Sequence, residues 1–262
     1  MPKLLIAVKS CHEDRARGAH DLLREMWGNE VRNADLLFFT GRLGLADPDE
    51  RIVTAPDDYK GLPYKTREIA RYATNNGYDH TFFTDTGSFV FVHHLLRYDY
   101  QSSDYIGYWG MALKPFDYKA ENRARGCKMV RFTKCYPWAS GGGYFLSRKA
   151  LGIVAGGEPP VWAEDLGVGQ MLAAHNIFLD DRSKIGYKGY VVDWICNENN
   201  GGNLDARRAW MQNLKDQSDA CMTSGMCEAY KRPQTRFDPP PIQDKRINPT
   251  PWDRSTKLLG FC

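Results

Sequence analysis

The sequence lacks any apolar run longer than a single strand, and no Gly-x-Gly-x-x-Gly fingerprint follows its first apolar run. The first absence predicts no membrane-spanning helix, because such a helix needs about 20 apolar residues. Met1-Pro2-Lys3 leads directly into the segment 4–8, which is too short for an export signal. We therefore expect a cytoplasmic protein with no membrane partner. The second absence argues against a dinucleotide-dependent oxidoreductase.

The seven cysteines include no Cys-x-x-Cys pair and no histidine at zinc-site spacing. Their odd number favours reduced thiols in a reducing compartment. The alternative, for a secreted chain, is a short loop closed by Cys221 and Cys227, with Cys262 stapling the tail.

Charge and composition are those of an ordinary globular protein: the net charge is +3 and 42% of the 262 residues are hydrophobic. We expect one large domain over residues 1–225. Prolines are frequent in the last stretch, so residues 226–262 are predicted to form an extended tail packed on the domain. The 13% share of aromatic residues suits a core as well as stacking on sugars or bases.

The first third of the chain alternates between strand-like and helix-like periodicity. The predicted elements are strands at 4–8, 35–39 and 81–84 and helices at about 14–27 and 62–75, the second helix ending at Gly77. This alternation indicates βαβ units and hence an α/β fold with a mostly parallel central sheet. A further helix is predicted at 204–217, after a polar segment, 197–203, that reads as a loop or a lid.

A glycine run and an acidic pair follow further along the chain. Gly141, Gly142 and Gly143 have no Cβ, so the backbone there can come close to a bulky ligand. Glu164 and Asp165 open a helix-like segment, in which one acid can cap the helix and the other can face a site. An acid in that position is suited to act as a base.

Asp85, Thr86 and Gly87 follow the predicted strand 81–84. Open α/β sheets bind their ligands at the carboxyl ends of the strands. Divalent cations such as Mn²⁺ or Mg²⁺ prefer carboxylate oxygens, so Asp85 is the candidate metal ligand.

Four segments together resemble the β-1,3-galactosyltransferase and Fringe family of glycosyltransferases. They are Asp21–Gly28, Asp58–Thr66, Phe82–Val90, and the Tyr-Pro-x-Ala-Ser-Gly-Gly-Gly-Tyr run followed by Glu164-Asp165-Leu166. Each segment alone is a weak signal, but the four are ordered and spaced as in that family. The resemblance covers residues 4–180.

The resemblance implies a GT-A fold, a UDP-sugar donor, assistance by Mn²⁺ or Mg²⁺, and inversion at the anomeric carbon. Asp165 matches the position of the family's catalytic base. With this resemblance we expect donor contacts from Ser10, Arg17, Lys65, Asp85, Thr86, Gly141, Gly142, Gly143 and Glu164. We expect acceptor contacts from Trp138, Trp162, Lys128 and Arg131.

The sequence departs from the family at Gly87, where the family's motif has an acid that grips the metal. A glycine has no side chain to offer, so metal affinity is expected to fall. Three explanations stay open. Gly87 is an inactivating change, or Asp85 and other groups hold the metal, or the enzyme works without metal. The family's late histidine ligand is also missing, because the last histidine is His175.

The acceptor is expected to be intracellular. The segment 114–134 holds seven basic and two acidic residues with aromatic residues between them, which is typical of a solvated loop or of a nucleic-acid contact. Hydroxymethylated cytosine in DNA, as in phage-encoded modification within a host cytoplasm, is therefore one expected acceptor, and a cytosolic glycan is another. A third reading is a sugar-nucleotide-binding module without transfer activity.

Overall fold

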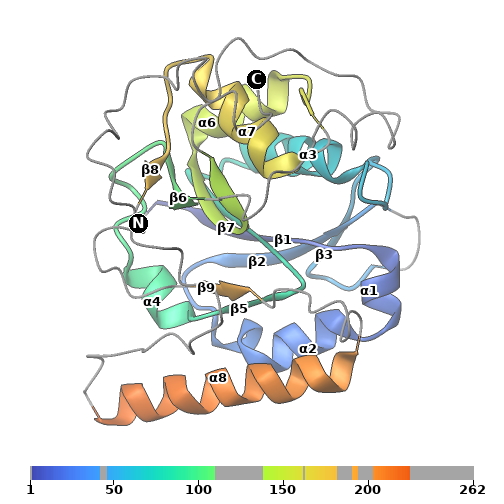
Figure 1. Ribbon diagram of the computed structural model, residues 1–262, viewed down its shortest axis with the longest axis vertical. Helices are drawn as coiled ribbons and strands as arrows, with labels where there is room; N and C mark the ends of the chain where they lie inside the picture. Colours follow the sequence, from blue (N-terminus) through green and yellow to red (C-terminus); the bar gives the residue numbers. More distant parts are fainter. Residues whose placement is uncertain are drawn as a thin grey trace, which may run out of the picture.

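The computed structural model describes residues 2–41, 46–109, 138–161, 163–181, 191–193 and 203–224. Its central sheet has seven strands in the order β3-β2-β1-β4-β7-β6-β8 (Figure 1). The strands are β1 Leu4–Lys9, β2 Asp35–Thr40, β3 Glu50–Ile52, β4 His80–Asp85, β6 Tyr105–Trp109, β7 Ala139–Ser147 and β8 Asp180–Asp181. Of these strands, β7 alone runs opposite to the others, because it pairs antiparallel with both β4 and β6. The predicted α/β fold with a mostly parallel sheet is confirmed.

Helices cover both faces of this sheet (Figure 1). One face carries α3 Leu62–Asn75, α6 Arg148–Gly156 and α7 Glu164–Ala173. The other carries α2 Ala19–Met26, α4 Val92–Arg97, α8 Leu204–Ser224 and a small sheet of β5 Ser88–Val90 and β9 Val191–Asp193. None of the described helices has the length and apolar character that crossing a membrane requires.

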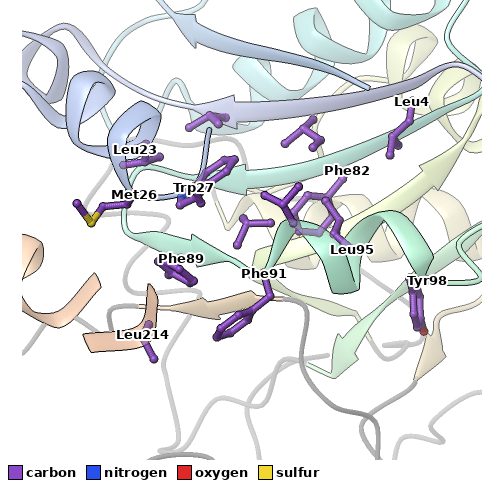
Figure 2. Packing of buried hydrophobic residues seen from close by; sticks show 14 of the residues in the cluster. Leu4, Leu23, Met26, Trp27, Phe82, Phe89, Phe91, Leu95, Tyr98 and Leu214 are labelled. Atoms are coloured by element: carbon purple, nitrogen blue, oxygen red, sulfur yellow. The ribbon is translucent and has the colours of Figure 1, made fainter. Parts of the chain in front are cut away.

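Side-chain alternation along β1 divides the core between the two faces. Leu4, Ile6 and Val8 belong to the cluster on the α2, α4 and α8 side, which Figure 2 shows around Trp27. Leu5 belongs to the cluster beneath α3, α6 and α7. Because successive side chains of a strand point to opposite faces, Lys9 at the end of β1 lies on the face of Leu5.

The predicted helix at 14–27 is wrong as a single element. The structure divides it into α1 His12–Ala16 and α2, with the break at Gly18. The φ angle of Gly18 is +88°, a left-handed conformation that residues with a Cβ rarely adopt. Helix periodicity continues across the break, which is why the sequence pattern did not reveal it.

Other predicted elements agree with the structure. Helix α3 has the predicted bounds, and Gly77 follows its end with a φ of +74°. Helix α8 begins where predicted and continues beyond residue 217 to Ser224. The tail 226–262, the basic segment 114–134 and the loop residues 197–202 lie outside the described residues.

Candidate active site

The site begins where β1 and β4 end side by side. Lys9 and Asp85 are register partners on these two parallel strands, so their side chains leave the same face of the sheet. By alternation this is the face of Leu5, which lies beneath α3 and α7. A cation and a carboxylate therefore meet at the carboxyl edge of the sheet, where parallel sheets bind ligands.

Glu164 anchors the first turn of α7 to that edge. Its Oε2 accepts a hydrogen bond from Lys9 Nζ at 2.9 Å, and both side chains are almost fully buried. Its Oε1 accepts from Thr66 Oγ1 at 2.8 Å and from the Tyr144 hydroxyl. Burial disfavours the ammonium, yet the Glu164 carboxylate outweighs this effect and holds the pKa of Lys9 above its ordinary value. Both Glu164 oxygens are occupied within the protein, which gives this residue a positioning role.

Asp165 is the neighbouring residue in the same turn and is only partly buried. Burial and, next, the charge of Glu164 raise the pKa of Asp165 to about 6. A carboxylate with this pKa is mostly ionised at neutral pH and accepts a proton more readily than an ordinary aspartate. The expected helix cap is wrong for both acids, because Ala163 occupies the N-cap and makes no side-chain cap bond.

Gly141 faces Asp165 across a small gap. A Cβ built at Gly141 would have Asp165 Oδ2 as its nearest atom, at 3.9 Å. A larger side chain at this position would therefore extend towards the carboxylate. A Cβ at Gly141 would already be in van der Waals contact with Asp165, so the glycine lets β7 lie close to this carboxylate.

The carbonyls of the glycine run receive hydrogen bonds from three side chains of the sheet edge. Lys9 Nζ donates to the Gly141 carbonyl at 3.4 Å. Thr84 Oγ1 donates to the Gly142 carbonyl at 2.9 Å, and Ser88 Oγ, whose single proton is shared with Asp85, lies 3.2 Å from the same carbonyl. These bonds hold β7 against the end of β4. Gly143 lies in β7 beside them.

The loop after β4 folds back on Asp85. Asp85 Oδ1 accepts from the Gly87 backbone N–H at 2.9 Å and from Ser88 Oγ at 3.0 Å. Burial raises the pKa of Asp85 against the opposing effects of Lys9 and these hydrogen bonds. Thr86 is buried, and its hydroxyl donates a hydrogen bond to Asp14 of α1. The Thr86 carbonyl accepts a hydrogen bond from Arg207 Nη1 at 3.2 Å.

The described residues fit a divalent cation poorly. Within them no group of three His, Cys, Asp or Glu side chains lies close enough to hold a metal. Asp85 is the one carboxylate of the 85–87 segment, and its Oδ1 is already engaged by Gly87 and Ser88. The cation Lys9 is its register partner. The Mn²⁺ or Mg²⁺ site stays a prediction, and Gly87 contributes no side chain to it.

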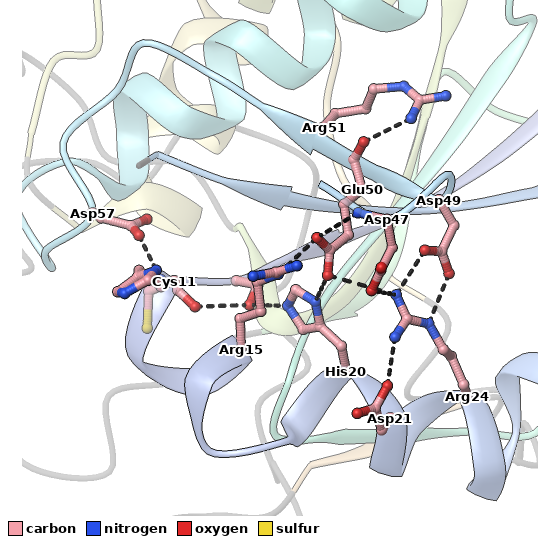
Figure 3. A network of polar contacts seen from close by, with 12 residues as sticks. Cys11, Arg15, His20, Asp21, Arg24, Asp47, Asp49, Glu50, Arg51 and Asp57 are labelled. Carbon is pink, nitrogen blue, oxygen red and sulfur yellow. Dashed lines mark hydrogen bonds and ion pairs between the residues drawn. The ribbon is translucent and has the colours of Figure 1, made fainter. Parts of the chain in front are cut away.

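On the opposite face of the sheet, Ser10 belongs to a buried polar chain with His20, Glu50 and Arg15, and Figure 3 shows the last three. Ser10 Oγ lies 2.6 Å from His20 Nε2, and His20 Nδ1 lies 2.6 Å from Glu50 Oε1. Burial lowers the pKa of His20, so the ring is neutral at physiological pH. Since a carboxylate only accepts, Nδ1 carries the proton and Nε2 accepts from the Ser10 hydroxyl. Arg15 completes the chain with a 2.7 Å contact to Glu50 Oε2.

Lys65 links Ser10, the first member of this polar chain, to Asp57. Its buried Nζ donates to the Ser10 carbonyl and to Asp57 Oδ1, the latter at 2.6 Å. Asp57 also accepts from the backbone N–H groups of His12 and Gly41, at 2.5 and 2.8 Å. One carboxylate thus ties together the chain segments that follow β1 and β2. The Lys65 ammonium is thus occupied by protein partners, and its predicted donor contact stays a prediction.

The remaining predicted residues divide into two groups. Arg17 is exposed and contacts Glu13 at 3.4 Å. Trp138 is partly buried against the small cluster of Val161, Ala163 and Leu166, whose last two members flank the pair Glu164 and Asp165 in the sequence. Trp162, Lys128 and Arg131 lie outside the described residues. The donor and acceptor roles of all these residues stay predictions.

Sequence reasoning missed several residues of the site. Lys9 is the clearest case, and its signal was a lysine that ends an otherwise apolar strand. Thr66 and Tyr144 both lie within the segments that carried the resemblance, yet their common partner Glu164 is about 20 or more residues away from each. Asp57 and Arg207 had no local signal, because their partners come from distant parts of the chain.

Comparisons with known proteins add a fold-level likeness. No protein-family model matches the sequence, and no curated protein matches it. The chain is similar to the crystal structure of a glycosyltransferase involved in the glycosylation of the major capsid of PBCV-1, with 10% identity, a TM-score of 0.47, and coverage of 80% of this chain and 99% of that one. It is also similar to the crystal structure of a protein from Bacillus anthracis designated a glucose-1-phosphate thymidylyltransferase, in complex with a sucrose. The identity is again 10% and the TM-score 0.47, and the match covers 80% of this chain and 95% of that one. At these values neither likeness assigns an activity, and the case for function rests on the side chains.

Proposed function

We propose that the protein is a glycosyltransferase that moves a sugar from a UDP-sugar to an acceptor hydroxyl, with Asp165 as the general base. The observation that carries this proposal is the pair Glu164 and Asp165. Glu164 is fixed by three hydrogen-bond donors, while Asp165 beside it has a pKa raised to about 6 and faces Gly141 of the glycine run. The resemblance to the β-1,3-galactosyltransferase and Fringe family supplies the reaction class.

The proposed reaction is a single displacement. The acceptor oxygen forms a bond to the anomeric carbon while the bond from that carbon to the diphosphate oxygen breaks. Asp165 takes the proton of the acceptor hydroxyl, and UDP leaves with the electron pair of the broken bond. Attack opposite to the leaving group inverts the configuration at the anomeric carbon.

For the acceptor we propose a hydroxymethylated cytosine in DNA. Support comes from the charge of the segment 114–134, seven basic against two acidic residues, which suits phosphate contacts. A cytosolic glycan is the competing acceptor, supported by the aromatic residues of the chain, which suit stacking on a sugar ring.

The test is mass spectrometry of acceptor products. Hydroxymethylcytosine DNA and a glycan panel are incubated with a panel of UDP-sugars, with and without Mn²⁺. The wild type is compared with Asp165→Asn and with the exposed control Asp216→Asn, a residue that contacts Gln212 on α8. We expect a sugar adduct with the wild type and Asp216→Asn, and a loss of about 100-fold or more with Asp165→Asn. If only glycans carried the sugar, a glycan would replace DNA as the proposed acceptor. If Asp165→Asn formed as much product as the wild type, Asp165 would not be the general base.

A second candidate, a binding module that holds a UDP-sugar without transferring it, is favoured by Gly87. The loss of a metal-gripping acid at this position is what decay of a catalytic site would look like. The discriminating measurement is slow release of UDP in the absence of acceptor. A transferase releases UDP by transfer to water, whereas a binding module does not.

A further inference from the structure

Arg207 extends from α8 to the loop that follows β4. Its Nη1 donates to the carbonyl of Thr86, the middle residue of the segment in which the resemblance expects the metal. Its positive charge also acts on Asp85, where it opposes the rise in pKa caused by burial. A fixed cation therefore contacts the loop whose second acid is replaced by Gly87.

The position of Arg207 on its helix is unusual. Leu204, Met211 and Leu214 form the inward stripe of α8, and Met211 and Leu214 are fully buried in the core cluster. Arg207 lies three residues after Leu204 and four before Met211, so it belongs to the same face. An arginine in an apolar stripe is costly unless its charge meets a partner.

Within the described residues Arg207 forms no ion pair. A guanidinium has five N–H groups, and one of those of Arg207 donates to the Thr86 carbonyl. The adjacent Arg208, by contrast, pairs with Glu25 on α2. Lys9 is the other buried cation at this edge, but its charge is balanced by Glu164 at 2.9 Å. Of the two cations described at this edge, Lys9 and Arg207, it is therefore Arg207 whose charge is available to an anion.

The helix that carries Arg207 is held firmly. Lys215 Nζ contacts Glu30 at 2.7 Å and donates to the Met26 carbonyl at 2.9 Å, which fixes the middle of α8 to α2 (Figure 1). Asn203 Oδ1 caps the helix by accepting from the backbone N–H groups of Asp205 and Ala206. A guanidinium on such a support is preorganised and needs little ordering when it binds a ligand.

Building on the proposed function, we propose that Arg207 binds the diphosphate of the nucleotide-sugar donor and supplies the positive charge that the family resemblance assigns to a divalent cation. The planar fork of a guanidinium matches two phosphate oxygens. As the bond to the anomeric carbon breaks, the diphosphate keeps the electron pair and its negative charge grows against Arg207. No proton moves at this residue, because a guanidinium stays protonated. Donor binding is then independent of metal.

The test is calorimetric titration of UDP into the full-length chain, in EDTA and then in Mn²⁺. The variant is Arg207→Met, which suits the apolar stripe and so leaves α8 in place, and the matched control is Arg208→Met. Binding of uridine, which has no phosphate, is followed by ligand-observed NMR. We expect the wild type to bind UDP in EDTA, with a Kd that Mn²⁺ changes less than about twofold. Arg207→Met is expected to weaken UDP binding by about 10- to 100-fold while uridine binding and the Arg208→Met variant are unchanged.

Four results would overturn the inference. UDP binding by the wild type that requires Mn²⁺, or that is unaffected by Arg207→Met, leaves the proposed function in place and removes the role of Arg207. An equal loss of uridine and UDP binding would show that Arg207 only shapes the pocket through Thr86. If the wild type bound UDP neither in EDTA nor in Mn²⁺, the proposed function would be overturned as well.

Discussion

The ammonium of Lys9 lies 2.9 Å from Oε2 of Glu164, so the last residue of β1 is joined to the first turn of a helix 155 residues later. Both side chains are almost completely removed from solvent. The pair places Asp165, the next residue, at the carboxyl edge of the sheet beside Gly141. An ion pair buried at this depth fixes geometry more than it adds stability, because desolvation offsets much of the attraction.

Removing one member of this pair is expected to destabilise the protein strongly. Lys9→Met leaves Glu164 buried with only its two hydroxyl donors, and we expect the free energy of unfolding to fall by about 3–5 kcal/mol. The matched control is Lys3→Met, whose 3.8 Å contact with Asp35 is exposed and is worth less than about 1 kcal/mol. Urea denaturation measures both. The double variant Lys9→Met with Glu164→Gln should recover part of the loss, and equal effects of Lys9→Met and Lys3→Met would contradict a buried pair.

The pH dependence of donor hydrolysis is expected to follow Asp165. A general base must be ionised, and the pKa of Asp165 is raised to about 6. We therefore expect kcat/KM for UDP release to be constant above pH 7 and to fall about tenfold for each pH unit below 6. Rates measured from pH 4.5 to 8 test this expectation. A profile that stays flat down to pH 5 would mean that another group accepts the proton.

Much of the fold could be predicted from periodicity, and much of the site could not. Helix α3 was predicted with its correct bounds because an apolar stripe and Gly77 define it locally. Strand β7 was missed, since its three glycines are typical of loops and its strand character comes from pairing with β4 and β6. The acids of the site were recognised as motif residues. Lys9, which pairs with Glu164, and Arg207, which donates to the Thr86 carbonyl, were not recognised, because contacts between distant residues leave no local pattern.

Asp165 is also expected to reduce stability at neutral pH. Well below pH 3.8, the ordinary pKa of an aspartate, its carboxyl is protonated in both the folded and the unfolded chain, so it costs nothing. Between about pH 4 and 6 the unfolded chain ionises first, because the folded pKa is about 6, and stability falls as pH rises. Asp165→Asn should therefore raise the free energy of unfolding by about 2 kcal/mol more at pH 7.5 than at pH 4. Denaturation at the two pH values measures this, with exposed Asp216→Asn as a control that should show no such difference. A constant effect of Asp165→Asn would contradict the raised pKa.

Introducing at residue 87 the acid that the resemblance expects should change how UDP is held. Gly87→Asp places a second carboxylate two residues after Asp85, next to the loop that Arg207 contacts. In EDTA the new charge repels a diphosphate and competes for Arg207, so UDP should bind about tenfold more weakly than to the wild type. With Mn²⁺ two carboxylates can share the cation, and the variant should bind UDP at least about tenfold more tightly than in EDTA. Gly87→Asn, which has the same shape without the charge, should show no response to Mn²⁺. Titration calorimetry with all three proteins measures the change in UDP affinity when Mn²⁺ replaces EDTA. If this change were as large in the wild type as in Gly87→Asp, Asp85 would hold a metal without help from residue 87.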